Sequence, residues 1–214
     1  MFHFPYRTLA ALAVAASMLP SLDASAASPV PAPAQDVPAA SVKGPQTAVF
    51  AGGCFWGVEH LFNEVPGVIE AVSGYEGGHV DHPSYEQVCM GRTGHAEAVD
   101  VAYDPSKVSY EQLLNSFWNM HDPTTLNRQG PDTGHQYRSV IFFHNPEQEQ
   151  AARKSKEQAQ KFFDRPIVTE IVPATDFWRA EEYHQRYFEK HPGHYSCHFV
   201  RGWVPSEAEE AKQA

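Results

Sequence analysis

Residues 47–57 read TAVFAGGCFWG and contain an apolar run, two glycines and the start of a helical pattern. The run at residues 47–51 is short and apolar, as in a buried strand. Gly52 and Gly53 allow a sharp turn with close backbone approach. The turn places Cys54 at a helix N-terminus, where unpaired N–H groups and the helix dipole favour a thiolate. The pattern predicts a reactive cysteine with a lowered pKa; the alternative is a buried structural cysteine.

Strand-like and helical patterns alternate along the rest of the globular part. Strands are expected at residues 68–75, 96–103, 135–143 and 167–172, and helices at residues 54–64, 110–120, 145–163 and 176–190. Several connections are short, so the first two of these strands could pair directly. The order favours an α+β fold over a doubly wound parallel sheet. We expect a mixed β-sheet with helices packed on it, a two-layer sandwich of ferredoxin-like character.

The N-terminal part of the chain has the layout of an export signal. One positive charge precedes a mostly apolar run at residues 8–20, and small residues follow at Ala24 and Ala26. We interpret residues 1–26 as a secretory signal peptide and expect an exported protein of the bacterial periplasm, free of the membrane after cleavage. The alternative, a membrane anchor, is disfavoured because spanning a bilayer takes about 20 apolar residues.

The remaining chain divides into three parts by composition. Residues 27–46 are rich in Pro and Ala without apolar periodicity and predict an extended linker. Residues 47–204 are expected to form one catalytic domain with a sizeable core. Residues 205–214 form a polar tail.

Charge and cysteine content exclude several classes of protein. The net charge is −10 with neutral histidines and there is no basic stripe, which argues against a nucleic-acid partner. Three cysteines are few for a disulfide scaffold, and an odd count leaves at least one thiol for chemistry or burial. The twelve histidines raise the possibility of a metal site, but neither Cys-x-x-Cys nor His-Glu-x-x-His spacing occurs.

A carboxylate and two phenols are the other candidate catalytic groups. Glu97 ends the motif GHAE at the start of an apolar strand, where it lies either on a solvated face or deliberately buried. A buried carboxyl has a raised pKa and can act as an acid. The long polar loop at residues 122–139 is expected to be ordered and functional. Tyr85 and Tyr137 either donate hydrogen bonds to a site or are half-buried core residues.

Two further cysteines could react with an oxidised Cys54. Cys89 lies in a segment held at both ends, whereas Cys197 follows the last predicted helix and Pro192-Gly193, where the chain can move. Mobility favours Cys197 as a resolving cysteine, because a disulfide requires close approach and suitable direction. A packed or exposed free thiol remains the alternative at Cys197.

Three sequence blocks together resemble the A-type peptide methionine sulfoxide reductases. They are GCFWG at residues 53–57, GHAE at residues 94–97 and the loop at residues 122–139, and the similarity extends over about residues 47–204. The resemblance implies an α+β fold and reduction of the S epimer of methionine sulfoxide, peptide-bound and free. It further implies repair of oxidised proteins without a cofactor, by an enzyme that we expect to be monomeric, and recycling by a thioredoxin-like reductant.

The resemblance also assigns roles to eight side chains. It makes Cys54 the nucleophile, Glu97 the acid, Tyr85 and Tyr137 the donors to the sulfoxide oxygen, Phe55 and Trp56 the groups that hold the substrate methyl, Asp132 a supporting residue, and Cys197 the resolving cysteine. Many relatives carry a second C-terminal cysteine, but none follows Cys197 here. A direct Cys54–Cys197 disulfide is therefore the simpler expectation. A thiol peroxidase and a non-catalytic module with a structural disulfide are the alternatives.

Overall fold

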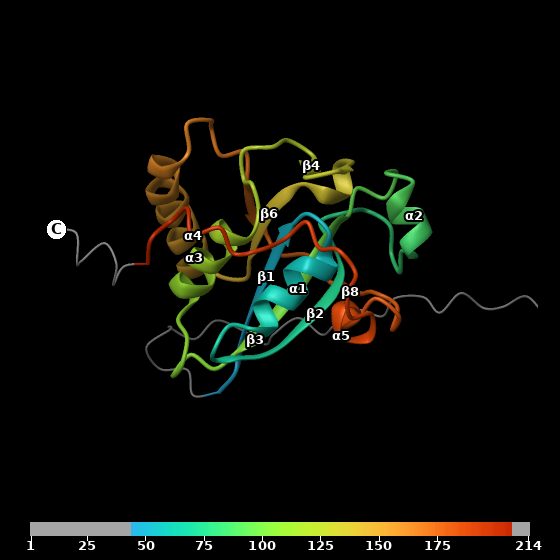
Figure 1. The fold of residues 1–214 in the computed structure, drawn as a ribbon, viewed down its shortest axis with the longest axis horizontal. Coiled ribbons are helices and arrows are strands. Elements are labelled where there is room, and N and C mark those ends of the chain that lie inside the picture. The colour runs from blue at the N-terminus through green and yellow to red at the C-terminus, as the bar shows by residue number, and fades with distance from the viewer. Residues whose placement is uncertain (1–43, 207–214) are drawn as a thin grey trace, which may run out of the picture.

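Strand β1 (Gln46–Gly52) forms the middle of the sheet, as its apolar sequence predicts. It pairs antiparallel with β3 (Ala96–Tyr103) on one side and with β6 (Ser139–Phe143) on the other. The structure is a computed structural model that describes residues 44–206 (Figure 1). The expected signal peptide, most of the expected linker and the tail from residue 207 lie outside the described residues.

The sheet has six strands in the order β7-β6-β1-β3-β2-β8. Strand β2 (Val68–Glu76) pairs directly with β3, which confirms the expected pairing, and the short β8 (Trp178–Arg179) extends β2. All these pairs are antiparallel except that of β6 with β7 (Glu170–Pro173), which is parallel. The expectation of an α+β fold with a mixed sheet is confirmed.

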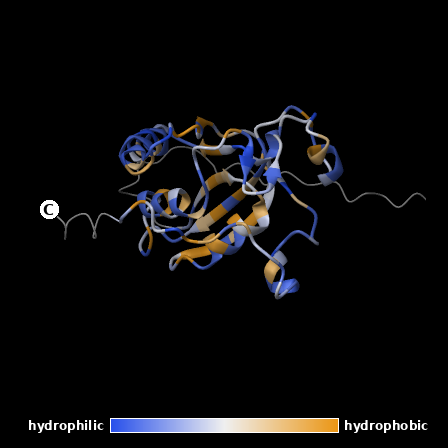
Figure 2. Ribbon diagram, turned by 45° about the horizontal axis from the view of Figure 1, so that its top comes forward, coloured by the Kyte–Doolittle hydropathy of each residue, from blue (hydrophilic) through white to orange (hydrophobic). Residues whose placement is uncertain are grey.

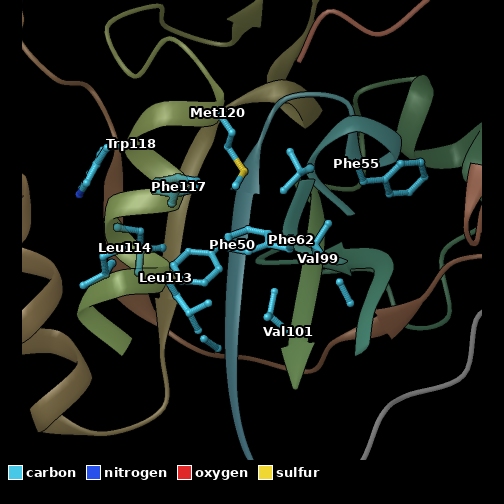
Figure 3. Close-up of a cluster of buried hydrophobic side chains, with 14 of the residues drawn as sticks. Phe50, Phe55, Phe62, Val99, Val101, Leu113, Leu114, Phe117, Trp118 and Met120 are labelled. Carbon is cyan, nitrogen blue, oxygen red and sulfur yellow. The ribbon is translucent and has the colours of Figure 1, made fainter. Parts of the chain in front are cut away.

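Helices α1 (Phe55–Asn63), α3 (Tyr110–Met120) and α4 (Pro146–Ala159) pack on one face of the sheet (Figure 1). Phe50 of β1 lies between Phe62 of α1 and Phe117 of α3, with ring centroids 5.0 and 5.2 Å away (Figure 3). Such aromatic pairs contribute about 0.5–1.5 kcal/mol each beyond area burial. This core fixes α1, and therefore Cys54, relative to the central strand.

The opposite face of the sheet carries a smaller apolar cluster. Its buried members are Val49, Ala51, Ala96, Ala98, Val140, Phe142 and Phe177. Figure 2 shows hydrophobic residues gathered along the central strands, whereas the outer helix α4 is largely hydrophilic. Within residues 44–206, no helix is both long and apolar enough to cross a membrane.

Local capping sets where the helices begin. Ser109 caps α3: its hydroxyl accepts a hydrogen bond from the Gln112 N–H, and the Ser109 N–H donates to the Gln112 side-chain oxygen. Asn145 caps α4 by accepting a hydrogen bond from the Gln148 N–H and is followed by Pro146, a residue favoured at the first helical position. The predicted helices at residues 110–120 and 145–163 are therefore present, although the α-helical part of the second ends at Ala159 and a 3₁₀ turn, Gln160–Phe162, follows.

The predicted helix at residues 176–190 is wrong. Its first part adds β8 to the sheet, turns follow, and only α5 (Tyr187–Lys190) is helical. Polar side chains of this segment form hydrogen bonds with the main chain of residues far away in sequence. The Gln185 side-chain oxygen accepts from the Ser73 N–H, and its NH₂ group donates to the Ser73 carbonyl. Arg186 then has a left-handed backbone with φ of 50°, which ends any regular helix.

Two predicted strands are shorter than expected, and three small elements were not predicted. Residues His135–Tyr137 form a 3₁₀ turn, so the strand begins only at Ser139, and β7 begins at Glu170 instead of residue 167. The unpredicted elements are α2 (Tyr85–Cys89) and the two-residue strands β4 (Arg128–Gln129) and β5 (Asp132–Thr133). The strands pair as a hairpin and give the loop at residues 122–139 an ordered path.

Candidate active site

Cys54 lies between the end of β1 and the first turn of α1, as the sequence predicts. Gly53 before it has a φ of +107°, and a Cβ at that position would stand 2.6 Å from the Gln129 Cβ, so the turn requires glycine. The Cys54 carbonyl accepts hydrogen bonds from the Gly57 and Val58 N–H groups at 3.2 and 3.4 Å. Cys54 is therefore the N-cap residue of α1.

The predicted lowering of the Cys54 pKa is wrong for this state of the site. Burial raises the pKa of the thiol well above its usual value, and negative charge on Glu97, Asp132 or Cys197, when these groups are ionised, raises it further. A hydrogen bond from the Trp56 main chain lowers the pKa, but burial outweighs it. Desolvation of a thiolate thus exceeds the benefit of the helix N-terminus, and the resting thiol keeps its proton.

Glu97 is buried beside the nucleophile, which excludes the solvated-face alternative. Its side chain is 2% exposed, and its Oε2 accepts a hydrogen bond from the Phe55 N–H at 3.0 Å. Burial is the largest cause that raises the pKa of Glu97 to about 8. The carboxyl is therefore mostly protonated at neutral pH and can donate a proton. It binds the N–H of the residue that follows Cys54.

The two phenols and Asp132 come to the same place from separate elements. Tyr85 lies in α2, Tyr137 ends the 3₁₀ turn and Asp132 lies in β5. Burial raises the pKa of both tyrosines, and ionisation of Glu97 raises each further. Negative charge on Asp132, or on Cys54 when it is ionised, also raises the Tyr137 pKa. Both phenols therefore keep their O–H donors.

Main-chain and carboxylate contacts hold Tyr85 in position. The Tyr85 N–H donates to Glu181 Oε1 at 2.9 Å, while the Tyr75 hydroxyl donates to Glu181 Oε2 at 2.8 Å. The Tyr85 ring stacks on Phe55 with centroids 6.5 Å apart. The Glu181 carboxylate thus connects α2 to β2 and fixes the phenol against the first turn of α1.

Phe55 and Trp56 form an aromatic wall next to the thiol. Phe55 is buried, and half-buried Trp56 stacks on Tyr187 with centroids 3.7 Å apart and planes within 4°. The Trp56 indole N–H donates to His184 Nδ1 at 2.9 Å, and the His184 ring lies 4.3 Å from that of Tyr85. Burial lowers the pKa of His184 to about 4, so the ring is neutral and accepts this hydrogen bond.

Cys197 reaches the site along an irregular C-terminal segment. Its Sγ lies 3.6 Å from Asp132 Oδ2 and 3.2 Å from His198 Nδ1. The segment is held in place: Arg201 donates to the main-chain oxygens of Met120, Cys197 and Phe199. Cys197 thus lies beside the site at rest and not at a distance from it. All three cysteines are free thiols in this structure.

Cys89 lies on α2 with an exposed side chain. It shares a hydrogen bond with Tyr85, four residues earlier on the same helix face, as the regular i,i+4 spacing allows. The expectation that Cys89 lies near the site in a restrained segment therefore agrees with the structure.

Several residues around the site were missed from the sequence. His184, Tyr187 and Glu181 were hidden because residues 176–190 were interpreted as one amphipathic helix. His198 could have been found, because it directly follows Cys197 and ends the motif YSCH at residues 195–198. Within residues 44–206, no group of three or more His, Cys, Asp or Glu side chains is arranged to hold a metal ion.

Comparisons with known proteins point to one family. The family profile of peptide methionine sulfoxide reductase matches residues 46–213. The peptide methionine sulfoxide reductase MsrA of Methanoculleus marisnigri is 62% identical over 150 residues, which cover 69% of this chain and 92% of that protein.

Solved structures show the same fold. Methionine sulfoxide reductase A of Corynebacterium diphtheriae superposes with a TM-score of 0.68 at 39% identity, covering 78% of this chain and 85% of that one. Mxr1 of Saccharomyces cerevisiae in complex with Trx2 gives a TM-score of 0.51 at 26% identity, covering 75% and 96%. On its sequence, its fold and the convergence of Cys54 with a buried carboxyl, the chain belongs to the peptide methionine sulfoxide reductase family, type A, and reduces the S epimer of methionine sulfoxide.

Proposed function

We propose that the chain repairs oxidised proteins by a two-cysteine cycle. Cys54 takes the oxygen from methionine sulfoxide, peptide-bound or free, and becomes a sulfenic acid. Cys197 then forms a disulfide with Cys54, and a thioredoxin-like dithiol reduces it. The observation that carries the proposal is the meeting of a buried carboxyl, a nucleophilic thiol and a second thiol around one helix N-terminus.

The first step requires a proton on the sulfoxide oxygen. Oxygen leaves sulfur poorly as an anion, so an acid must meet it as the bond breaks. Glu97 holds such a proton because burial raises its pKa to about 8. Glu97 gives this proton to the oxygen and recovers one from the Cys54 thiol. The sulfoxide S–O bond breaks, an S–O bond forms on Cys54, and methionine leaves.

The surrounding side chains suit a substrate with an oxygen and a methyl group on one sulfur. Tyr85 and Tyr137 keep their O–H groups and would donate to the oxygen as charge develops there. Loss of one such donor in other enzymes costs about 3–4 kcal/mol of transition-state stabilisation. Phe55 and Trp56 supply an apolar wall for the methyl group, and Asp132 supports the site beside Cys197.

Recycling by a thioredoxin-like donor is supported by the complex of yeast Mxr1 with Trx2. A disulfide between two cysteines is the natural substrate of such a dithiol, because exchange proceeds through a mixed disulfide. The cycle needs no cofactor, since the thiols carry the electrons. We also propose that the enzyme acts as a monomer.

We propose in addition that the protein is exported and acts in the periplasm. The support is the sequence of residues 1–26, with its positive charge, apolar run and small residues before the expected cleavage site. The donor would then be a thioredoxin-like protein of that compartment. The sequence of the mature N-terminus tests this proposal.

The central experiment compares single turnovers of the reduced full chain and its cysteine variants without added dithiol. Wild type should form one methionine per enzyme, lose two thiols and contain a Cys54–Cys197 disulfide by peptide mapping. Cys197→Ser should also form one methionine but leave a dimedone-reactive sulfenic acid and stall with thioredoxin. Cys54→Ser should form none while keeping its thermal unfolding temperature.

Two outcomes would contradict the cycle. The first is turnover above a few per cent in Cys54→Ser. The second is a Cys54–Cys89 bond in oxidised wild type. Hydrogen peroxide serves as a comparison oxidant: faster oxidation of Cys54 by peroxide than by methionine sulfoxide would favour a thiol peroxidase instead.

A further inference from the structure

The imidazole of His198 connects the turn before Cys54 to the thiol of Cys197. Its Nε2 lies 2.8 Å from the Gly52 carbonyl oxygen, and its Nδ1 lies 3.2 Å from the Cys197 Sγ. A carbonyl oxygen can only accept a hydrogen bond, so Nε2 carries the proton. In the neutral ring, Nδ1 is then a lone-pair acceptor, and the thiol of Cys197 is the donor.

Packing holds the ring in this orientation. His198 is 5% exposed and fills the space left by two glycines around Cys54. A Cβ at Gly57 would stand 2.5 Å from Nδ1, and one at Gly53 would stand 3.1 Å from Nε2. Burial lowers the pKa of His198, so the ring is neutral and the lone pair of Nδ1 faces the Cys197 thiol.

Asp132 is the other acceptor within reach of the Cys197 thiol. Its Oδ2 lies 3.6 Å from the sulfur, farther than His198 Nδ1 at 3.2 Å. The shorter distance favours transfer of the proton to His198.

A base is needed because the Cys197 thiol is hardly ionised by itself. Burial is the largest cause that raises its pKa to about 11, and the charge of Asp132 adds to it. At neutral pH only about one thiol in 10⁴ would then be ionised. The attacking species in a thiol reaction is the thiolate, so the proton of Cys197 must be removed before or during the attack.

We propose that His198 is the general base for disulfide formation, taking the proton of the Cys197 thiol at Nδ1 as that sulfur attacks the sulfenic acid of Cys54. This rests on the proposed function. An S–S bond forms and the S–O bond of Cys54 breaks. The Cys197 sulfur is oxidised and the Cys54 sulfur is reduced. The imidazolium returns the proton to the departing hydroxyl group, which leaves as water.

The experiment uses two variants of the full chain that separate packing from basicity. In His198→Gln the amide nitrogen lies near the position of Nε2 and can still donate to Gly52, but no base faces the thiol. In His198→Asn the amide oxygen lies near Nδ1 and can accept from the thiol, but it takes no proton. Quenched single turnovers give the rate of methionine formation and the rate at which dimedone-reactive sulfenic acid disappears.

We expect the ratio of the second rate to the first to fall about 10²-fold or more in both variants, the range for general base catalysis. The second rate should also rise about tenfold per pH unit in the variants between pH 7 and 10, because it then depends on free Cys197 thiolate. In wild type this dependence should be much flatter. Asp132, Arg201, His121 and Cys54 also face the pair and are present in all three proteins. The comparison therefore isolates His198.

Failure of this inference differs from failure of the proposed function. If oxidised wild type contains the Cys54–Cys197 disulfide but the variants keep the wild-type ratio and pH profile, His198 is not the base. An equal slowing of both steps would leave the ratio unchanged and would show a purely structural role. If wild type forms no Cys54–Cys197 disulfide, the two-cysteine cycle itself is wrong, and the inference fails with it.

Discussion

Replacing Glu97 by Gln is expected to stabilise the protein increasingly as the pH rises, while it slows the chemistry. Burial raises the pKa of Glu97 from 4.5 in the unfolded chain to about 8 in the fold. Between these pH values the folded state holds a proton that the unfolded state has lost, so the free energy of unfolding falls with pH. The contribution of this group is fully present below about pH 4.5 and is lost as pH rises through about 8.

The size of the effect on the free energy of unfolding follows from the difference between the Glu97 pKa values in the unfolded and folded states. Each pKa unit corresponds to roughly 1.4 kcal/mol, so the full range is about 5 kcal/mol at most. Between pH 5 and pH 8 the difference between variant and wild type should grow by roughly 3–4 kcal/mol. Gln keeps the volume of the side chain and an oxygen that can accept the Phe55 N–H. It has no proton to lose in this range.

The measurement is urea unfolding of both proteins at pH 5, 6, 7 and 8, with linear extrapolation to water. Glu157→Gln is the matched control, because Glu157 is an exposed carboxylate on α4 and its removal should give a constant difference. A Glu97→Gln difference that stays constant within about 0.5 kcal/mol would refute the reasoning, because Glu97 would then not be held protonated by the fold.

In the same variant, single-turnover methionine formation should slow by about 10² or more. The wild-type rate should fall above about pH 8.

Three further predictions concern other parts of the chain. Cys89→Ser should turn over nearly as wild type does and still form the Cys54–Cys197 disulfide, which peptide mapping checks; loss of that bond would instead give Cys89 a place in the relay. Mass spectrometry of native material should find the mature N-terminus at Ala27 or Ser28, and a protein that begins at Met1 would reject export. Gly57→Ala should lower the free energy of unfolding by roughly 1–3 kcal/mol, because the added Cβ would meet His198 at 2.5 Å; unchanged urea unfolding would show that the C-terminal segment yields without cost.

The elements that position Cys54 could be predicted because their sequences are locally unambiguous. The apolar run before Gly52, the helical spacing after Cys54 and the capping residues of the longer helices agree with the structure. Buried Glu97 was one of two alternatives, and its strand of otherwise apolar residues could not decide between them. The burial of Glu97 is explained by Phe55, whose N–H donates a hydrogen bond to the carboxyl inside the fold.

The rest could not be predicted because tertiary contacts override local pattern. The apolar spacing over residues 176–190 is typical of a helix, yet Gln185 and Glu181 bind the main chain of Ser73 and Tyr85, and this ties the segment to β2 and α2. The raised pKa of Cys54 was missed for a similar reason. A helix N-terminus is visible in the sequence, whereas the groups that bury the thiol come from distant segments.

The position of β1 in the sheet has a consequence for how the protein is made. Its two neighbours, β3 and β6, lie later in the chain, and the ring that packs against the turn before Cys54 is that of residue 198. Pairing of segments so far apart in sequence comes late in folding, because the intervening chain must first be closed into loops. Until nearly the whole domain has left the ribosome, the burial that raises the pKa of the Cys54 thiol is not in place. A nascent chain is therefore open to oxidation and mixed disulfides at Cys54, and completion of the domain ends that vulnerability.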